Sequence, residues 1–264
     1  MTLPLFSPGE DPGPSFLGLL AHLGLESPGP QAPMGPSGVT HGTTVLAIRY
    51  VDGVVMAGDR RATTGNLISH RSMEKVFPAD NTSGVAIAGA AGPAMEMVCL
   101  FQLQLEHYEK VEGNPLSLDG KANQLSQMLR SHLPAAMQGL AVLPIFAGYD
   151  ERVQTGRLFQ FDITGGRYEE RAHAAVGSGS LHATTVMKIR HHDDLDREGA
   201  VDIAVEALFQ AADEDTATGG PDPIRGIYPV VAAITADGYE RLPDDEVAAR
   251  TDALLRRIGG GEAT

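Results

Sequence analysis

The pattern of apolar and polar residues changes abruptly near residue 42. Residues 1–42 contain eight of the chain's 17 prolines and eight of its 31 glycines, and such a segment cannot bury enough apolar surface to offset its ordering entropy. The exception is the stretch 15–25, where a serine precedes an apolar run that could form a helical turn and dock on a partner. We therefore predict a largely disordered leader over 1–42 and a folded domain over 43–264, with a flexible tail from about residue 258.

Beyond the leader, short apolar runs alternate with long amphipathic segments. Two runs, 45–50 and 54–57, flank Asp52-Gly53, and an Asp-Gly pair in this position is a strong hairpin signal. We expect a polar loop over 59–70 and further strands at 84–89, 140–148, 156–162 and 227–235. Helical periodicity predicts helices at 92–111, 118–137, 180–191, 197–213 and 244–257. Because the strands group in hairpins, we predict an α+β fold with two antiparallel sheets and helices on their outer faces.

The composition limits the kinds of molecule that the protein is expected to bind. The chain has 264 residues, of which 42% are hydrophobic, and a net charge of −14. The leader has three acidic residues and no Lys or Arg, which leaves 20 basic and 31 acidic residues in the rest, a net charge of −11. This charge disfavours nucleic acid and anionic membranes as partners. The apolar run 16–25 follows no basic residue and is too short to span a bilayer, so we expect a cytoplasmic protein without signal peptide or anchor.

The chain offers little for metal or disulfide chemistry. Cys99 is the single cysteine, which excludes an intrachain disulfide, and its apolar helical surroundings predict a packing residue. There is no Cys/His set with zinc spacing, and the polar run 191–194 is interpreted as a solvated loop. The acidic stretch 213–220 lacks EF-hand spacing, so a loop after a helix is preferred there. We predict no metal and no organic cofactor.

The boundary between leader and domain carries the main chemical signal, Gly42-Thr43-Thr44. Cleavage before Thr43 would leave a hydroxyl nucleophile and a free α-amine on one residue. Such an amine has a pKa of roughly 7.7–8.0, which suits a general base at cellular pH. Gly42 suits the cleavage because a residue without Cβ lets the backbone kink toward the hydroxyl. We therefore predict cleavage between Gly42 and Thr43.

Two charged residues follow in positions that suit this chemistry. Asp59 ends the second strand, and a hairpin returns that end beside the start of the first strand, near Thr43. Lys75 paired with Asp59 near the hydroxyl would lower the pKa of the hydroxyl. The turn 89–92 precedes the first long helix, and its N–H groups could form an oxyanion hole. A plain strand-to-helix turn is an equally good interpretation of that segment. The Gly-rich turn 177–180 is neither a nucleophile elbow nor a dinucleotide-binding loop.

Several motifs together resemble the β subunits of the proteasome, above all the actinobacterial type. They are Gly42-Thr43-Thr44, Gly58-Asp59-Arg60-Arg61, Lys75, Ala88-Gly89, Gly177-Ser178-Gly179 and Asp215-Thr216-Ala217-Thr218-Gly219-Gly220. Sixteen residues separate Thr43 from Asp59, and sixteen more separate Asp59 from Lys75, as the family pattern requires. The resemblance covers about residues 40–240. It implies the four-layer α-β-β-α sandwich of the N-terminal-nucleophile hydrolases and a threonine endopeptidase with no cofactor.

The resemblance also implies a role for each matching residue. Thr43 would be the nucleophile and its amine the base, Asp59 and Lys75 would tune it, and the Gly89 N–H would hold the oxyanion. Supporting polar groups around the amine would be Ser178, Asp215 and Thr218, the last in place of the serine of many family members. A mainly apolar pocket for the residue before the scissile bond would be lined by Ala62, Thr63, Met73, Phe77, Ile87, Ala91 and Met95.

Further implications concern assembly. Family members form stacked seven-membered rings in which β subunits lie between rings of α subunits. An ATPase regulator acts through the α ring, and polypeptide substrates carry a small ubiquitin-like tag in actinobacteria.

Three alternatives remain open. A simpler bacterial two-component peptidase also begins with Thr-Thr, but the long leader argues against it. A non-catalytic structural ring subunit is disfavoured because Gly42, Thr43, Asp59 and Lys75 are all present. The third alternative is an N-terminal-nucleophile amidase that acts on a small molecule.

Overall fold

The computed structural model describes residues 42–260. The predictions for the leader, including the helical turn at 15–25, therefore lie outside the described residues. Within 42–260, no helix is long and apolar enough to cross a membrane.

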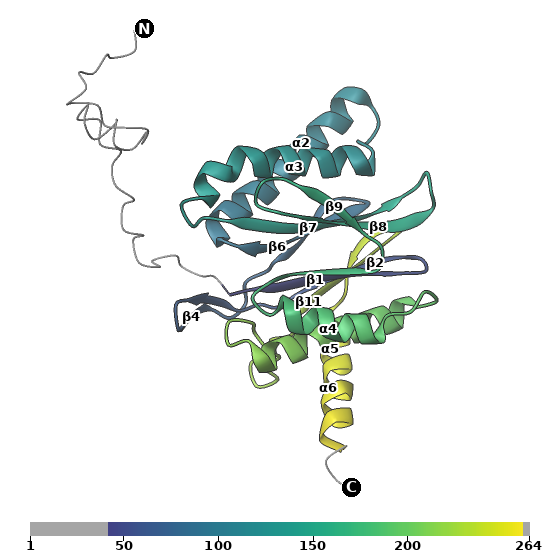
Figure 1. Cartoon of the computed structure of the whole chain (residues 1–264). Coiled ribbons are helices and arrows are strands. Elements are labelled where there is room, and N and C mark those ends of the chain that lie inside the picture. Colours follow the sequence, from purple (N-terminus) through teal and green to yellow (C-terminus); the bar gives the residue numbers. More distant parts are fainter. Residues whose placement is uncertain (1–41, 261–264) are drawn as a thin grey trace, which may run out of the picture. The chain divides into compact units, whose positions relative to one another are not determined.

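Two five-stranded antiparallel sheets form the centre of the domain (Figure 1). The first sheet has the order β10-β1-β2-β11-β12, with β1 Thr44–Tyr50, β2 Gly53–Gly58, β10 His173–Gly177, β11 Val230–Thr235 and β12 Gly238–Arg241. The second sheet has the order β5-β6-β7-β8-β9, with β5 Val76–Asp80, β6 Ser83–Gly89, β7 Val142–Asp150, β8 Thr155–Phe161 and β9 Arg167–Glu170. A separate ribbon pairs β3 Ala62–Thr64 with β4 Leu67–His70.

Helices cover the outer face of each sheet (Figure 1). The second sheet is covered by α2 Ala91–Glu112 and α3 Leu118–Ala136, and the first by α4 Ser180–Arg190 and α5 Arg197–Glu214. The last helix, α6 Asp244–Gly260, packs against α5. The layers are therefore helix, sheet, sheet and helix, which confirms the predicted α-β-β-α sandwich.

The centre of strand β1 is buried on both faces, which explains the apolar run Val45-Leu46-Ala47-Ile48. Val45 and Ala47 point toward the second sheet and join the core between the sheets. Leu46 and Ile48 point the other way and pack against α4 and α5. Side chains alternate between the two faces of a strand, so a stretch buried on both faces is apolar at successive positions. This strand carries the start of the domain into the core at a fixed position.

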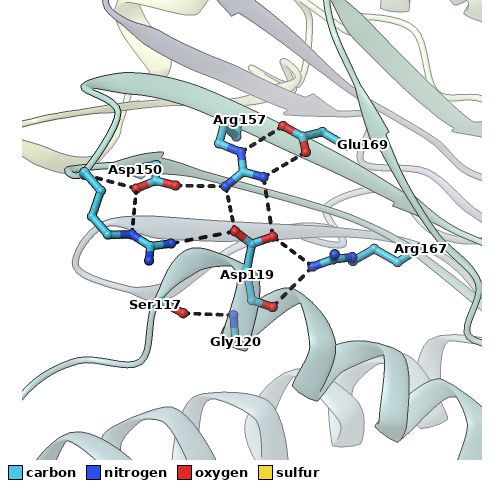
Figure 2. Close-up of polar contacts among 8 residues, drawn as sticks. Ser117, Asp119, Gly120, Asp150, Arg157, Arg167 and Glu169 are labelled. Atoms are coloured by element: carbon cyan, nitrogen blue, oxygen red, sulfur yellow. Dashed lines mark hydrogen bonds and ion pairs between the residues drawn. The ribbon is translucent and has the colours of Figure 1, made fainter.

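A cluster of charges fixes α3 against the second sheet (Figure 2). The guanidinium of Arg157 on β8 donates hydrogen bonds of 2.8 Å to the carboxylates of Asp119, Asp150 and Glu169. Asp119 lies in the first turn of α3, whose N-cap is Ser117. The hydrogen bond from Arg157 lowers the pKa of Asp119 below its ordinary value. Because Asp150 is buried, its charge depends on this partner.

The structure corrects several predictions. The polar loop expected over 59–70 contains β3 and β4, and the strands β5, β9, β10 and β12 were not predicted. These strands are short, and β9 is largely exposed, so they lack a clear apolar pattern. The tail expected from residue 258 is helical to Gly260. Cys99 is exposed on α2, so the prediction that it packs in the core is wrong.

Candidate active site

Thr43 lies at the start of the first sheet, immediately before β1. Thr43 is 5% exposed, and its carbonyl oxygen accepts a hydrogen bond of 2.9 Å from the N–H of Ser178. The preceding N–H, that of Gly42, donates to the hydroxyl of Thr63 at 3.1 Å. The backbone on both sides of the Gly42–Thr43 bond is thus held in place by the rest of the domain.

Asp59 accepts four hydrogen bonds beside this position. Its Oδ1 accepts from the N–H of Thr44 at 2.9 Å and from Nζ of Lys75 at 2.7 Å. Its Oδ2 accepts from the N–H groups of Arg61 and Gly219, both at 2.8 Å. Asp59 is fully buried, so its charge requires this complete set of donors.

Lys75 is buried with Asp59 and is 2% exposed. Its Nζ also donates to the carbonyl oxygen of Arg61 at 2.5 Å. Burial lowers the pKa of Lys75 below its ordinary value, and the Asp59 carboxylate opposes this effect. The hairpin of β1 and β2 produces the arrangement, because Val45 pairs with Gly58 and Asp59 follows directly. The Lys75 ammonium lies close to the start of β1, since it shares the acceptor Asp59 Oδ1 with the Thr44 N–H.

A second carboxylate, Asp215, accepts hydrogen bonds from two hydroxyl groups, and a third hydroxyl is linked to it indirectly. Its Oδ2 accepts from the hydroxyls of Ser178 and Thr218, both at 2.5 Å. Burial raises the pKa of Asp215, but hydrogen bonds from Ser178 and Thr218 outweigh burial and leave the pKa below its ordinary value. The hydroxyl of Thr44 lies 2.6 Å from that of Thr218. Since the Thr218 hydrogen already points to Asp215, Thr44 must donate to Thr218.

Gly42 has no room for a side chain. A Cβ at this position would lie 1.8 Å from Cβ of Ala217 and 2.8 Å from its carbonyl oxygen. Ala217 belongs to the loop between Asp215 and Thr218, which the hydrogen bonds described above hold in place. The glycine predicted from backbone freedom is therefore also required by close packing.

Gly89 ends β6 with a φ of 117°, a conformation that favours glycine. A Cβ there would lie 2.2 Å from the carbonyl oxygen of Ala141. The N–H of Ala90 donates to that same oxygen at 2.8 Å, so Ala90 is not available to an oxyanion. This removes Ala90 from the candidate donors of the turn, and the role of the Gly89 N–H stays a prediction.

The predicted pocket residues lie on β3, β5, β6 and α2 and in the segment before β5. The N–H of Ile87 on β6 donates to the carbonyl oxygen of Lys75 at 2.9 Å, and Phe77 follows on β5. Thr63 on β3 contacts Gly42 through the hydrogen bond described above. The remaining four are Ala62 on β3, Met73 before β5, and Ala91 and Met95 on α2. Met95 is 39% exposed, which suits the rim of a pocket more than its floor.

The segment that contains Thr43, Asp59 and Lys75 is similar to known proteins. A family model described as "Proteasome subunit" matches residues 39–224, which include the whole arrangement around Thr43. This chain belongs to the proteasome subunit family. A protein of Acidimicrobium ferrooxidans named "Proteasome subunit beta" is 56% identical over 98% of this chain and 96% of its own. Proteins of the same name from Streptomyces griseus and Acidothermus cellulolyticus are 57% and 55% identical, over 82% and 85% of this chain and 77% and 80% of theirs.

Membership of the proteasome family agrees with the observed layers of the sandwich. These relatives identify a β subunit of the 20S proteasome core, a hydrolase that works in protein degradation as part of a multi-subunit assembly. Within residues 42–260 the structure contains no group of three or more His, Cys, Asp or Glu side chains suited to a metal ion.

Sequence reasoning missed some residues of this proteasome site. Thr44 was given no role of its own beside Thr43. Its N–H donates to Asp59, however, and its hydroxyl contacts that of Thr218. Gly179 donates its N–H to the Thr44 hydroxyl at 3.0 Å, and a Cβ there would lie 2.6 Å from that oxygen. The glycines within the motifs were the available signal, because a glycine lets other groups approach its backbone closely, as the Thr44 and Thr218 hydroxyls do at Gly179.

Proposed function

We propose that this proteasome β subunit is made as a precursor of a threonine endopeptidase, with Thr43 as the nucleophile after removal of residues 1–42. The buried Asp59–Lys75 pair carries this proposal, because it lies beside the start of β1 and Asp59 accepts hydrogen bonds from four donors there. Burying an ion pair costs desolvation free energy, and a buried pair at the start of β1 with perturbed electrostatics favours a role in chemistry at Thr43.

The precursor would cleave itself at the Gly42–Thr43 bond. The Thr43 hydroxyl attacks the Gly42 carbonyl carbon, the C–N bond breaks, and the acyl group moves from nitrogen to oxygen. The hydroxyl proton passes to the departing nitrogen, which becomes the free α-amine. Water then hydrolyses the ester, and the leader leaves with a carboxylate on Gly42. The fixed positions of Gly42 against Ala217 and of the Thr43 carbonyl against Ser178 support this step, since they hold the reacting bond in one geometry.

The mature site would then cleave peptides in two steps. The α-amine accepts the hydroxyl proton as Thr43 attacks a peptide carbonyl, and it later returns the proton to the departing amine. The Gly89 N–H would stabilise the oxyanion, and Lys75 would stabilise negative charge on the Thr43 oxygen. Ser178, Asp215 and Thr218 would orient the amine. Water finally hydrolyses the acyl-ester and regenerates Thr43.

The proposal extends to the assembly. We expect this subunit to form cytoplasmic seven-membered β rings stacked between rings of α subunits. An ATPase regulator would act through the α ring and deliver polypeptides that carry a small ubiquitin-like tag. Support comes from the proteasome relatives, and the regulator and the tag rest on the family resemblance.

Intact-mass measurement after assembly with the α partner tests the proposal. The wild-type chain is expected to lose residues 1–42, whereas Thr43→Ala retains them and has no peptidase activity. Thr64→Ala, on the exposed side of β3, is the matched control and is expected to mature normally. Maturation of Thr43→Ala at the wild-type rate would assign the cleavage to another residue. A wild-type chain that keeps its leader in the assembled particle would support a structural subunit instead.

A further inference from the structure

A small cavity lies behind the segment that follows Asp59. Its volume is about 30 Å³, and three arginines, Arg60, Arg61 and Arg71, contribute to its walls together with the backbone at Gly219 and Gly220. A water molecule needs roughly 10–15 Å³ of such space, so the cavity has room for a small polar group. Three guanidinium groups around one cavity are unusual in a chain with a net charge of −14.

The charges around the cavity are incompletely matched. Arg60 donates to Asp244 at 2.9 Å through one Nη, but its buried Nε has no hydrogen-bond partner among the described residues. The Arg61 guanidinium donates to the neutral carbonyl of Thr216 at 3.0 Å. One carboxylate, Asp222, also lines the cavity; it pairs with Arg225 at 2.6 Å, and this hydrogen bond together with the positive charge of Arg71 lowers its pKa, so a single carboxylate serves the three arginines of the cavity and Arg225. A buried donor without an acceptor is rare in folded proteins, and here it lies beside two further guanidinium groups.

The walls of the cavity also hold the catalytic carboxylate of the proposed site. The N–H groups of Arg61 and Gly219 both donate to Asp59 Oδ2 at 2.8 Å. The two segments pack without a gap, since a Cβ on Gly219 would lie 2.6 Å from Cβ of Arg61. A group bound in the cavity would therefore lie against Arg61 and Gly219, the two residues whose N–H groups bind Asp59.

We propose that this cavity binds a small oxyanion, with Arg60 Nε, Arg61 and Arg71 as donors. Guanidinium groups match carboxylate, sulfate and phosphate oxygens, and charge-assisted hydrogen bonds to them are strong. The oxyanion is either a free inorganic ion or a carboxylate of a neighbouring subunit in the assembled proteasome. The bound oxyanion accepts the hydrogen bond of Arg60 Nε. It also holds in place the backbone of Arg61 and Gly219, whose N–H groups donate to Asp59. The site is separate from Thr43, so it does not depend on the proposed peptidase activity.

Sulfate is the probe for the test. Thermal unfolding of the full-length chain is followed at low millimolar sulfate, with sodium chloride added to keep the ionic strength constant. The wild-type melting temperature is expected to rise and saturate. Arg71→Gln is expected to weaken the apparent sulfate affinity about tenfold or more, because one charge-assisted hydrogen bond is lost. Arg71 is exposed, so its replacement leaves the core intact. Arg256→Gln, exposed on α6 and outside the cavity, should respond as the wild type does.

The assembled particle distinguishes the two sources of the oxyanion. If a neighbouring subunit supplies a carboxylate, the sulfate response of the isolated chain disappears on assembly. If a free ion fills the cavity, the response persists in the particle. Sulfate also stabilises proteins generally through exclusion from their surfaces, but that effect does not saturate at low concentration. An equal, non-saturating response in the wild type and in Arg71→Gln would overturn the proposal.

Discussion

The contact between Gly42 and Ala217 gives a sharp prediction about leader removal. In Gly42→Ala the new Cβ would lie 1.8 Å from Cβ of Ala217, whereas carbon atoms in contact are normally about 3.5–4.0 Å apart. The backbone must therefore move by roughly 1.5 Å or more, and a misplacement of about 1 Å can slow a reaction about 100-fold. We expect leader removal in Gly42→Ala to be slower than in the wild type by at least about 100-fold.

The assay is a time course of leader removal on denaturing gels after the precursor is mixed with its α partner. Gly92→Ala is the matched control, because a Cβ at Gly92 would have no neighbour within 4 Å. The double variant Gly42→Ala with Ala217→Gly should recover part of the rate, since it removes the nearest contact. Contacts of 2.7 Å and 2.8 Å to the Ala217 backbone would remain. Removal of the leader from Gly42→Ala at the wild-type rate would refute the packing argument.

Three further predictions concern the ion pairs and Asp215. Lys75→Met should abolish peptide hydrolysis and lower the free energy of unfolding by about 3–5 kcal/mol, because it leaves the Asp59 charge buried without its cation. Thr218→Val should raise the folded-state pKa of Asp215. That pKa is low in the native protein, so the stability it contributes is lost as pH falls, and acid unfolding should begin at a higher pH in the variant. Arg157→Met should lower the free energy of unfolding in urea by about 2–4 kcal/mol, since Asp150 loses its main partner.

Each of these predictions has a clear contrary result. Full hydrolysis by Lys75→Met would remove the ion pair from the mechanism. For Asp215, Thr218→Ser retains the hydroxyl and should follow the wild-type acid transition, and an unshifted transition in Thr218→Val would show that the hydroxyl does not control this pKa. Arg256→Met is the control for Arg157→Met, and equal urea midpoints for the two variants would mean that the cluster in Figure 2 adds no stability.

Some of the fold followed directly from local sequence patterns. The helix expected over 92–111 is α2 at Ala91–Glu112, and the one expected over 197–213 is α5 at Arg197–Glu214. A long amphipathic segment repeats its apolar pattern over several helical turns, so the pattern determines both the type and the extent of the element well. The short strands β9 and β12 have four residues each and a largely exposed or mixed surface, which leaves too little pattern to detect.

The candidate site likewise has a part that local sequence predicts and a part that depends on contacts between distant segments. Its chemistry is local, because Gly42-Thr43 and the tight hairpin that brings Asp59 beside β1 can be identified from adjacent residues. By contrast, the contact of Ala217 with Gly42 and the hydroxyls gathered around Asp215 join segments more than 30 residues apart. Local sequence was therefore enough to identify Thr43 and the first hairpin. Which distant loops close around Thr43 depends on sheet order and register, and these follow from how both sheets pack together rather than from any single segment.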